Sequence, residues 1–543
     1  MMTITELQQR YAAHPNVEAM SGLLKNPSVR TLFCGGLCAS AASLFSSVLV
    51  QRGEFPFVFI LGDLEEAGYF YHDLTQVLGT DKVLFFPSSF RRAIKYGQKD
   101  AANEILRTEV LSRLQKGEEG LCVVTYPDAL AEKVVSRKEL GDKTLKLHLG
   151  ENVDTNFIME VLRSYGFEYV DYVYEPGQYA VRGSIIDVFS FSSEFPYRID
   201  FFGDEVESIR TFEVETQLSK EKKDSIVIVP DLSRSLEQGG ASGMVSFLDF
   251  LSADTVLAMR DLLWLRERIQ TVHDETLTPQ AIAAREAEES GCITLDGKLI
   301  DGSEFTLRAL DFRRMEFGNK PTGTPDATIT FDTSAQPIFR KNFDMVAESF
   351  KEYMEKGYAL YICSDSMKQT DRIRAIFEDR GDQIAFTAVE RTLHEGFADN
   401  ALRLCIFTDH QLFDRFHKYN LKSDKARSGK VALSLKELNQ FTPGDYVVHT
   451  DHGVGRFSGL VRIPNGDTTQ EVMKLVYQNE DVVFVSIHSL HKVSKYKGKD
   501  GEAPRLNKLG TGAWEKLKER TKTKIKDIAR DLIRLYSQRR AEK

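Results

Sequence analysis

The pattern of apolar and polar positions divides the chain into stretches where strands alternate with helices and stretches of strands alone. In the first alternating stretch, short apolar runs predict strands, and apolar residues at three- and four-residue spacing predict helices between them. A second stretch, 343–408, repeats this order. The expected strands are 31–34, 57–61, 82–86, 120–125, 358–364, 383–387 and 402–408, and the expected helices are 39–50, 65–77, 101–115, 346–355 and 367–379. Such alternation indicates parallel βαβ units with helices on both faces of a sheet. The second stretch groups no nucleophile with a base, which favours a scaffold or spacer role.

Residues 174–217 follow a different pattern, with period-two alternation between tight turns, and this predicts antiparallel strands. Within 197–202, Tyr197, Ile199 and Phe201 point one way, while Arg198, Asp200 and Phe202 point the other. The first set is typical of a core face. An aromatic ring beside a guanidinium on the outer face is typical of an interface, and Arg182 adds a second guanidinium. The alternative is a surface strand with an ordinary cross-strand ion pair.

The second strand-rich stretch, about 439–500, has glycines at short intervals between Val, Tyr and Phe. This pattern predicts a small, strongly curved sheet or barrel, because glycine relieves the corners. Another strand pair, 471–477 and 481–487, follows. The histidine pairs 449/452 and 488/491 have no neighbouring cysteine and no convincingly spaced carboxylates, so no metal site is predicted.

The last predicted element is a long amphipathic helix, about 513–540, with an apolar stripe at three- and four-residue spacing. From Glu515 to Lys543 it carries eleven basic residues against five acidic ones. The stripe favours docking on another domain, and a DNA-binding arm is the alternative.

Composition limits these interpretations. A length of 543 residues predicts three to five domains, and the ordinary apolar and charged fractions, 42% and 28%, indicate a globular protein. A net charge of −9 restricts any nucleic-acid contact to a local patch. Six scattered cysteines without a Cys-x-x-Cys pair predict reduced thiols and a cytoplasmic location. The uncharged run 32–50 contains a Gly-Gly turn, which favours a strand and buried helix over a membrane span.

The turn after the first strand is where a βαβ fold would hold a nucleotide phosphate. Laid on the phosphate-loop pattern, Gly36 supplies the first glycine and Ser43 the final hydroxyl, but Ala41 and Ala42 replace the second glycine and the lysine. No ammonium is left to meet the phosphates. We therefore expect a packed turn and no ATPase activity, so this chain is predicted not to be an enzyme, and ATP hydrolysis is the alternative.

Two motifs resemble a known family. The run AVRGSIIDVF with PYRIDFFGDEVESIRTF, at 180–212, is similar to a signature shared by the excision-repair helicase UvrB and the bacterial transcription-repair coupling factors. The run GDYVVHTDHGVGRF, at 444–457, resembles the RNA polymerase interaction domain that these factors share with CarD regulators. The carboxyl-terminal run from Leu509 resembles the connector helix that precedes the helicase motor. No further phosphate-loop lysine motif or DExx box follows in the 543 residues.

The resemblance implies an α/β multidomain fold: a UvrB-like degenerate helicase-type α/β domain with an inserted mainly-β domain, a second α/β domain, a small SH3/Tudor-like β-barrel and a C-terminal amphipathic helix. The implied ranges are 1–145 and 230–338 for the two parts of the first α/β domain, 146–229 for the UvrA-binding domain, 339–438 for the spacer, 439–500 for the polymerase interaction domain and 501–543 for the connector helix.

The resemblance also implies function. The chain would hold a stalled RNA polymerase through its β subunit and recruit UvrA to the lesion, in transcription-coupled nucleotide excision repair. Arg182, Arg198 and Phe202 are the implied UvrA contacts. A polymerase contact through an exposed strand edge is expected on 471–477, with Met473 and Leu475 as its residues. ATP, magnesium and most DNA contacts would belong to a motor outside this chain, which would itself need no cofactor. A UvrB-like, DNA-binding lesion verifier is the alternative.

Overall fold

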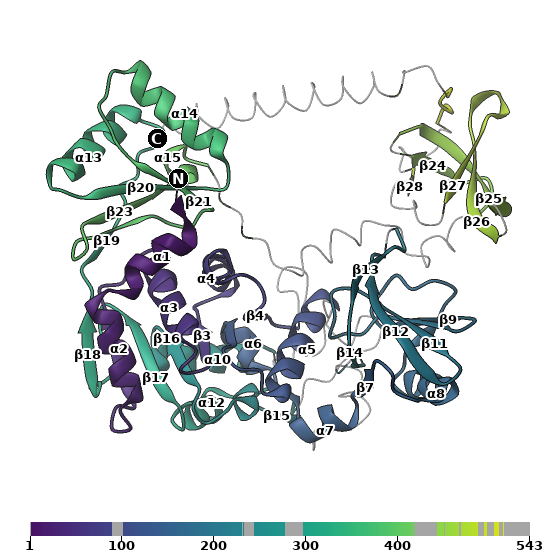
Figure 1. Cartoon of the computed structure of the whole chain (residues 1–543), viewed down its shortest axis with the longest axis horizontal. Coiled ribbons are helices and arrows are strands. Elements are labelled where there is room, and N and C mark those ends of the chain that lie inside the picture. Colours follow the sequence, from purple (N-terminus) through teal and green to yellow (C-terminus); the bar gives the residue numbers. More distant parts are fainter. Residues whose placement is uncertain are drawn as a thin grey trace. The chain divides into compact units, whose positions relative to one another are not determined.

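The computed structural model describes residues 2–89, 101–214, 216–230, 232, 244–276, 297–415, 417, 419, 442–449, 451–465, 468–486, 493–496, 504–509 and 514 (Figure 1). The chain forms two compact units: 1–212 with 219–425, and 213–218 with 426–543. Apart from Trp514, the predicted carboxyl-terminal helix lies outside the described residues. No described helix combines the length and apolar character needed to cross a membrane.

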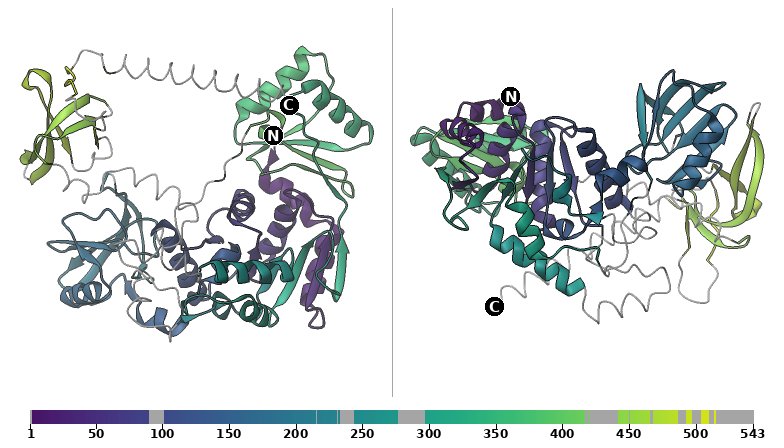
Figure 2. Two further views of the ribbon diagram at one scale, coloured as in Figure 1. Left: turned by 180° about the vertical axis from the view of Figure 1, so that it is seen from behind. Right: turned by 90° about the horizontal axis from the view of Figure 1, so that it is seen from below.

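The first sheet has seven parallel strands in the order β18-β2-β17-β16-β3-β5-β4. Its strands are β2 (Thr31–Gly35), β3 (Phe57–Ile60), β4 (Val83–Phe86), β5 (Cys122–Thr125), β16 (Val256–Met259), β17 (Arg313–Gly318) and β18 (Ala327–Thr330). Helices lie on both faces (Figures 1 and 2): α3 (Ala41–Arg52), α4 (Leu64–Leu78), α5 (Ala101–Lys116), α6 (Pro127–Ala131), α10 (Leu262–Thr276) and α12 (Gly302–Ala309). The last three strands follow the inserted domain in the chain, so the expected return into this sheet is observed.

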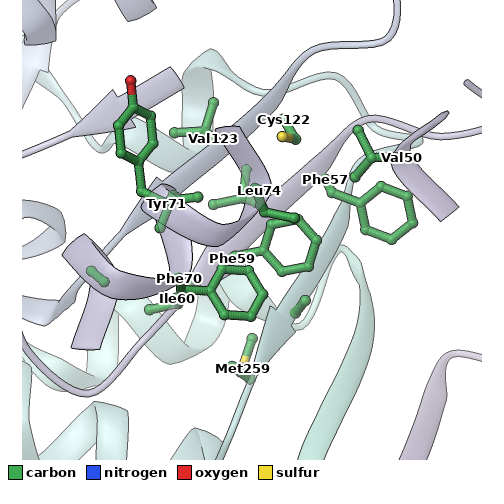
Figure 3. Close-up of a cluster of buried hydrophobic side chains, with 14 of the residues drawn as sticks. Val50, Phe57, Phe59, Ile60, Phe70, Tyr71, Leu74, Cys122, Val123 and Met259 are labelled. Carbon is green, nitrogen blue, oxygen red and sulfur yellow. The ribbon is translucent and has the colours of Figure 1, made fainter. Parts of the chain in front are cut away.

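Helices on both faces bury the sheet completely, which is why its strands are continuous apolar runs. Phe57 and Phe59 stack at a ring-centroid distance of 5.6 Å, and Phe59 contacts Phe70 of α4 at 5.0 Å (Figure 3). The run 32–50, which has nearly the length of a membrane span, forms β2, a turn and α3, with most of its apolar side chains in this core.

The inserted domain is a six-stranded sheet in the order β13-β12-β11-β10-β9-β8, antiparallel except for the β8–β9 pair. Its elements are β8 (Glu168–Tyr169), β9 (Gln178–Arg182), β10 (Ile185–Val188), β11 (Tyr197–Phe202), β12 (Glu205–Phe212), β13 (Ser219–Lys222) and α8 (Thr155–Ser164). Ile158 and Leu162 of α8 share a hydrophobic core with the sheet. A separate strand pair, β7 (Leu145–His148) with β14 (Ser225–Ile228), lies where the chain enters and leaves this domain.

The second α/β sheet has the order β1-β21-β20-β23-β22-β19. Its elements are β20 (Ala359–Ser364), β21 (Thr387–Glu390), β22 (Phe397–Asp399), β23 (Leu404–Thr408), α13 (Phe343–Glu355), α14 (Met367–Asp379) and α15 (Asp409–Leu412). Two strands come from outside the expected 339–438 range: β1 (Met2–Thr3) and β19 (Thr333–Ala335). The strand expected at 383–387 begins only at Thr387, where pairing with β20 starts.

The second unit contains a five-stranded antiparallel sheet in the order β27-β26-β25-β24-β28. Its strands are β24 (Tyr446–His449), β25 (Gly453–Asn465), β26 (Thr468–Val476), β27 (Val482–Ser486) and β28 (Val493–Lys495). Gly455 lies against the Tyr477 ring, where a Cβ would come within 2.9 Å of it. That close approach is the role expected of a glycine inside a strand. Closure into an SH3/Tudor-like barrel stays a prediction.

Candidate partner-binding surfaces

One face of the inserted sheet carries a row of charged side chains, which we call the arginine face. Its central row runs across five paired strands, from Ala180 to the four charged residues Asp187, Arg198, Arg210 and Lys222. The opposite face carries Tyr179, Ile186, Ile199 and Ile209, all buried in the core with α8. The period-two assignment of faces is therefore confirmed.

The arginine face is organised around Asp187, whose side chain is 0% exposed. Arg198 donates from Nε to Oδ1 at 2.8 Å and from a terminal nitrogen to Oδ2 at 2.9 Å. Arg182 pairs with the same carboxylate. Each guanidinium also lies over a ring, Arg198 over Phe212 at 4.4 Å and Arg182 over Tyr172 at 5.0 Å. These contacts fix both arginines before any partner binds.

Phe202 lies at the end of β11 and is 76% exposed. It pairs with Glu205 across a two-residue turn in which Gly203 has φ +64°, a left-handed conformation that favours glycine. Val153 donates to the Asp204 carbonyl at 2.8 Å, which ties the turn to the preceding segment. Phe202 is thus an exposed aromatic side chain on a well-anchored hairpin.

The sequence interpretation missed two members of this face. Asp187 neutralises both predicted arginines, and Arg210 lies 3.8 Å from Asp200, which also accepts from Ser184 at 2.9 Å. A carboxylate within the apolar run SIIDVF was the available signal, since such a group is rarely buried without a cationic partner. The cross-strand ion pair weighed as the alternative is therefore present, and Arg198, with its side chain 15% exposed, is largely committed to it.

The expected polymerase contact on 471–477 needs correction. β26 is a central strand, paired with β25 on one side and β27 on the other, so it has no free edge from Val472 to Val476. Met473 and Leu475 are both 0% exposed and form the core of this sheet. Val472 and Val476, on the opposite side of the strand, are also buried, so β26 offers few exposed apolar side chains.

The described strands leave β27 at one edge of this sheet. Phe484, 49% exposed, and Val482 are the apolar side chains that this edge strand presents to solvent, and Leu460 of β25 is also exposed. β25 pairs with β24 only as far as Arg456, so its second half is paired on one side alone within the described residues. These two edges have the unpaired backbone that an added strand requires.

The degenerate phosphate loop forms a packed turn between β2 and α3. Gly36 has φ +82°, and a Cβ there would lie 2.0 Å from the Phe331 carbonyl oxygen. Its own carbonyl accepts from Thr333 Oγ1 at 2.6 Å. Ala41 begins α3 and is buried, and Ala42 is half-buried. Gly36 is therefore required by close packing against the chain itself.

The mouth of this turn is closed by the loop that follows β21. Ser43 donates to Asp73 of α4 at 2.8 Å, and the His394 backbone nitrogen donates to the same carboxylate at 2.7 Å. The Glu395 nitrogen donates to Ser40 Oγ at 2.9 Å. Burial raises the pKa of Asp73 to about 7. The hydroxyls of Ser40 and Ser43 are already bonded within the chain, and a carboxyl group in place of a cation lies beside Ser43, so these residues do not fit a nucleoside triphosphate.

No group of three or more histidine, cysteine or acidic side chains is arranged for a metal ion within the described part of the chain. His449 and His452 stack face to face at a centroid distance of 4.6 Å.

Comparison with known proteins assigns both strand-rich regions. The model of the UvrB interaction domain matches residues 145–233, and that of the CarD-like/TRCF RID domain matches 441–497. The transcription-repair-coupling factor of Bacillus subtilis (strain 168) is 23% identical over 580 residues, covering 94% of this chain and 48% of that protein.

The resemblance to the transcription-repair coupling factors is confirmed. The factor of Staphylococcus aureus (strain bovine RF122 / ET3-1) is 24% identical over 571 residues and is likewise covered to 48%. The chain thus spans about half the length of the curated coupling factors that it matches. The arginine face lies inside the first matched domain, and β24 to β28 lie inside the second.

Proposed function

We propose that this chain is a non-catalytic adaptor that joins RNA polymerase to UvrA in transcription-coupled repair. The observation that carries the proposal is the presence of a UvrB interaction domain and a CarD-like/TRCF RID domain on one chain. The closed turn at Gly36–Ser43 supports the non-catalytic part, because its hydrogen-bonding groups are already used within the chain.

UvrA is the proposed partner of the arginine face, with Phe202 as the side chain that inserts into it. Exposed aromatic residues beside fixed guanidinium groups are the usual anchors of protein interfaces. Arg182 and Arg198 contribute positive charge from positions that Asp187 already fixes, so little side-chain entropy is lost on binding. The face carries Arg182, Arg198, Arg210 and Lys222 against Asp187 and Asp200, which suits an acidic surface on UvrA.

The β subunit of RNA polymerase is the proposed partner of the second unit, through strand addition to an edge of its sheet. We place this contact on β27, with Phe484 and Val482 as contact residues, because this strand combines an open edge with exposed apolar side chains. Met473 and Leu475 support that edge from the core.

The test of the UvrA contact is binding of the whole chain to cognate UvrA, compared for Phe202→Ala and Phe157→Ala. Phe157 is a matched control, since it is an exposed phenylalanine of the same domain, on α8. Loss of a true anchor should cost about 2 kcal/mol, roughly a thirtyfold weaker Kd. We expect Phe202→Ala to show this loss and Phe157→Ala to bind like the wild type. Equal binding by all three proteins would refute the placement.

Arg198 is a poor first variant, because changing it leaves the buried Asp187 carboxylate with only Arg182. Arg198→Glu would weaken binding through misfolding as readily as through the lost contact. Arg182→Gln, at the more exposed position, is the better test of charge. We expect a loss of up to tenfold in affinity that shrinks at high salt, and an unchanged salt dependence would contradict a charge contribution.

A further inference from the structure

A cluster of two buried and two half-buried histidines lies where the two α/β sheets meet, and the proposed adaptor function does not use it. Its members are His72 of α4, His394 in the loop after β21, His410 of α15, and His417. We call them the histidine junction. They are brought together only by the fold, since more than 300 positions separate the first from the other three. Both sheets contribute residues to one continuous hydrophobic core around them.

The rings of the histidine junction pack face to face or edge to face. His417 stacks on His410 at a centroid distance of 4.3 Å and contacts the edge of His72 at 4.9 Å. His394 stacks on Tyr69 of α4 at 3.5 Å and on His417 at 5.8 Å. Stacked rings present their faces to one another, so the arrangement favours neutral imidazoles and places like charges close together if protons bind.

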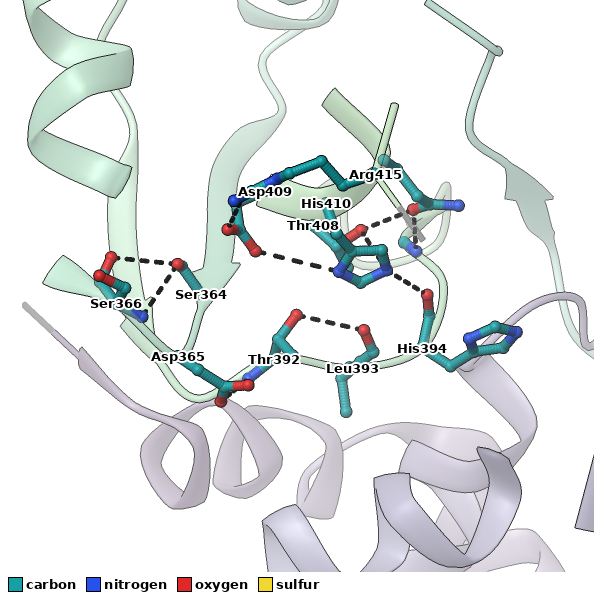
Figure 4. Close-up of polar contacts among 12 residues, drawn as sticks. Ser364, Asp365, Ser366, Thr392, Leu393, His394, Thr408, Asp409, His410 and Arg415 are labelled. Atoms are coloured by element: carbon teal, nitrogen blue, oxygen red, sulfur yellow. Dashed lines mark hydrogen bonds and ion pairs between the residues drawn. The ribbon is translucent and has the colours of Figure 1, made fainter. Parts of the chain in front are cut away.

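Each of the four rings has a nitrogen with no hydrogen-bond partner among the described residues: Nε2 of His72 and Nδ1 of His394, His410 and His417. The other nitrogen of His410 donates to the His394 carbonyl at 2.7 Å, which leaves its Nδ1 unprotonated when the ring is neutral (Figure 4). A proton added to Nδ1 would gain little, since the closest carboxylate oxygen, on Asp409, is 3.9 Å away.

Other charged groups around the junction are already paired. Asp409 accepts from Arg415 at 2.6 Å, and Asp365 accepts from the Thr392 nitrogen at 3.2 Å. Asp73 accepts from Ser43 and from the His394 nitrogen, and His394 Nε2 lies 4.0 Å from the exposed Glu395. Among the described residues, only the exposed and distant Glu395 lacks another partner in this set, so the surrounding carboxylates compensate poorly for several new positive charges.

We propose that the histidine junction is an acid-sensitive latch between the two α/β domains. Neutral, packed imidazoles hold the loop after β21 against α4, and protonation of these imidazoles releases the loop. The same loop closes the turn at Gly36–Ser43 through His394 and Glu395, so release would also open that turn.

The sign of the pH dependence follows from proton uptake on opening. Burial, with the neighbouring histidines, lowers the pKa of His72, His394 and His417 from 6.5 to about 4, and burial also lowers the pKa of His410. The closed junction is therefore fully stabilised above about pH 6.5 and weakens as the pH falls toward 4. Burial acts oppositely on two carboxyl groups, because it raises the pKa of Asp73 to about 7 and that of Asp409 as well.

Four histidines take up protons on opening, and at most two aspartates release them. With a net uptake of about two protons, the equilibrium constant for opening rises by at most about a hundredfold for each unit by which the pH falls within this window. Even one net proton would give about tenfold.

The experiment measures backbone amide exchange of the whole chain at pH 7, 6 and 5. The wild type is compared with the triple variant His72→Gln, His394→Gln and His417→Gln, whose side chains stay neutral throughout. Comparing both proteins at the same pH cancels the intrinsic pH dependence of exchange. In the wild type we expect the protection of 393–395, relative to β5, to fall at least tenfold from pH 6 to pH 5. The triple variant should change less than threefold, and His148→Gln, at an exposed histidine, should follow the wild type.

A parallel fall in protection in the wild type and the triple variant would overturn the proposal, as would constant protection in the wild type. If the triple variant does not fold, the proposal is tested instead by following the imidazole proton resonances of the wild type as the pH is lowered. Four histidine signals that stay unprotonated below pH 5.5 while the fold persists would support the latch. Titration of all histidines near pH 6.5 in the folded protein would refute it.

Discussion

The two strand-rich domains differ in how much alternation alone tells about their outer surface. In β11, alternation placed Phe202 outside and Phe201 inside, as observed. In β26, the residues chosen for a partner, Met473 and Leu475, form the core. Alternation defines two sets of side chains in each strand, but only the charged neighbours of β11 identify the outer set. In β26, both sets of side chains at 472–477 are apolar apart from Lys474. Which set faces the core could therefore be decided only from the neighbouring strands.

The comparison is sharpest at two adjacent phenylalanines of β11. Replacing Phe201 by alanine should lower the free energy of unfolding of the inserted domain by about 4 kcal/mol, because its ring is buried in the core with α8. Replacing Phe202 should change it by less than about 0.5 kcal/mol. Backbone amide exchange of β10 and β11, recorded in the whole chain, measures the change in unfolding free energy for each variant. Similar losses for the two variants would show that the faces are wrongly assigned.

The charged row of the same sheet should be nearly as sensitive. Asp187→Ala leaves Arg198 and Arg182 without their carboxylate, and we expect a loss of about 3 kcal/mol. Asp200→Ala is the control on the same face, with a long ion pair to Arg210 and an expected loss below about 1 kcal/mol. Urea unfolding of each variant, monitored by backbone amide exchange in β10, measures these losses. If Asp200→Ala lowered the stability more than Asp187→Ala, Asp187 would not be the residue that organises the arginine face.

In the second unit the order of effects should separate core from edge. Leu475→Ala should destabilise the five-stranded sheet by at least about 2 kcal/mol, while Phe484→Ala should cost less than about 1 kcal/mol. Binding to the polymerase β subunit should show the opposite sensitivity at temperatures where both variants are folded. If Leu475→Ala lost binding while fully folded, the proposed placement on β27 would fail.

The smallest effect is expected at the degenerate phosphate loop. Ala42→Lys restores the missing ammonium, yet we expect no measurable nucleotide binding, because Ser43 and Ser40 remain bonded to Asp73 and Glu395. Equilibrium binding of a fluorescent ATP analogue checks this, with a phosphate-loop ATPase as positive control. Micromolar binding by the variant would show that the single substitution, and not the closed mouth, had disabled the site.

Local patterns in the sequence were enough to predict many of the structural features of this protein. The βαβ order, the glycine turn of 32–50, the faces of β11 and the missing phosphate-loop lysine all depend on residues within a few positions of one another. Periodicity and turn chemistry act over that range, so the sequence contains them directly.

Tertiary structure decided the features that depend on distant partners. It made β26 a central strand, brought Asp187 between two arginines, joined β1 and β19 to the second sheet, and assembled the histidine junction around His417. Strand order and cross-strand register arise from packing among segments that can be hundreds of residues apart, and no local pattern records which segments those are.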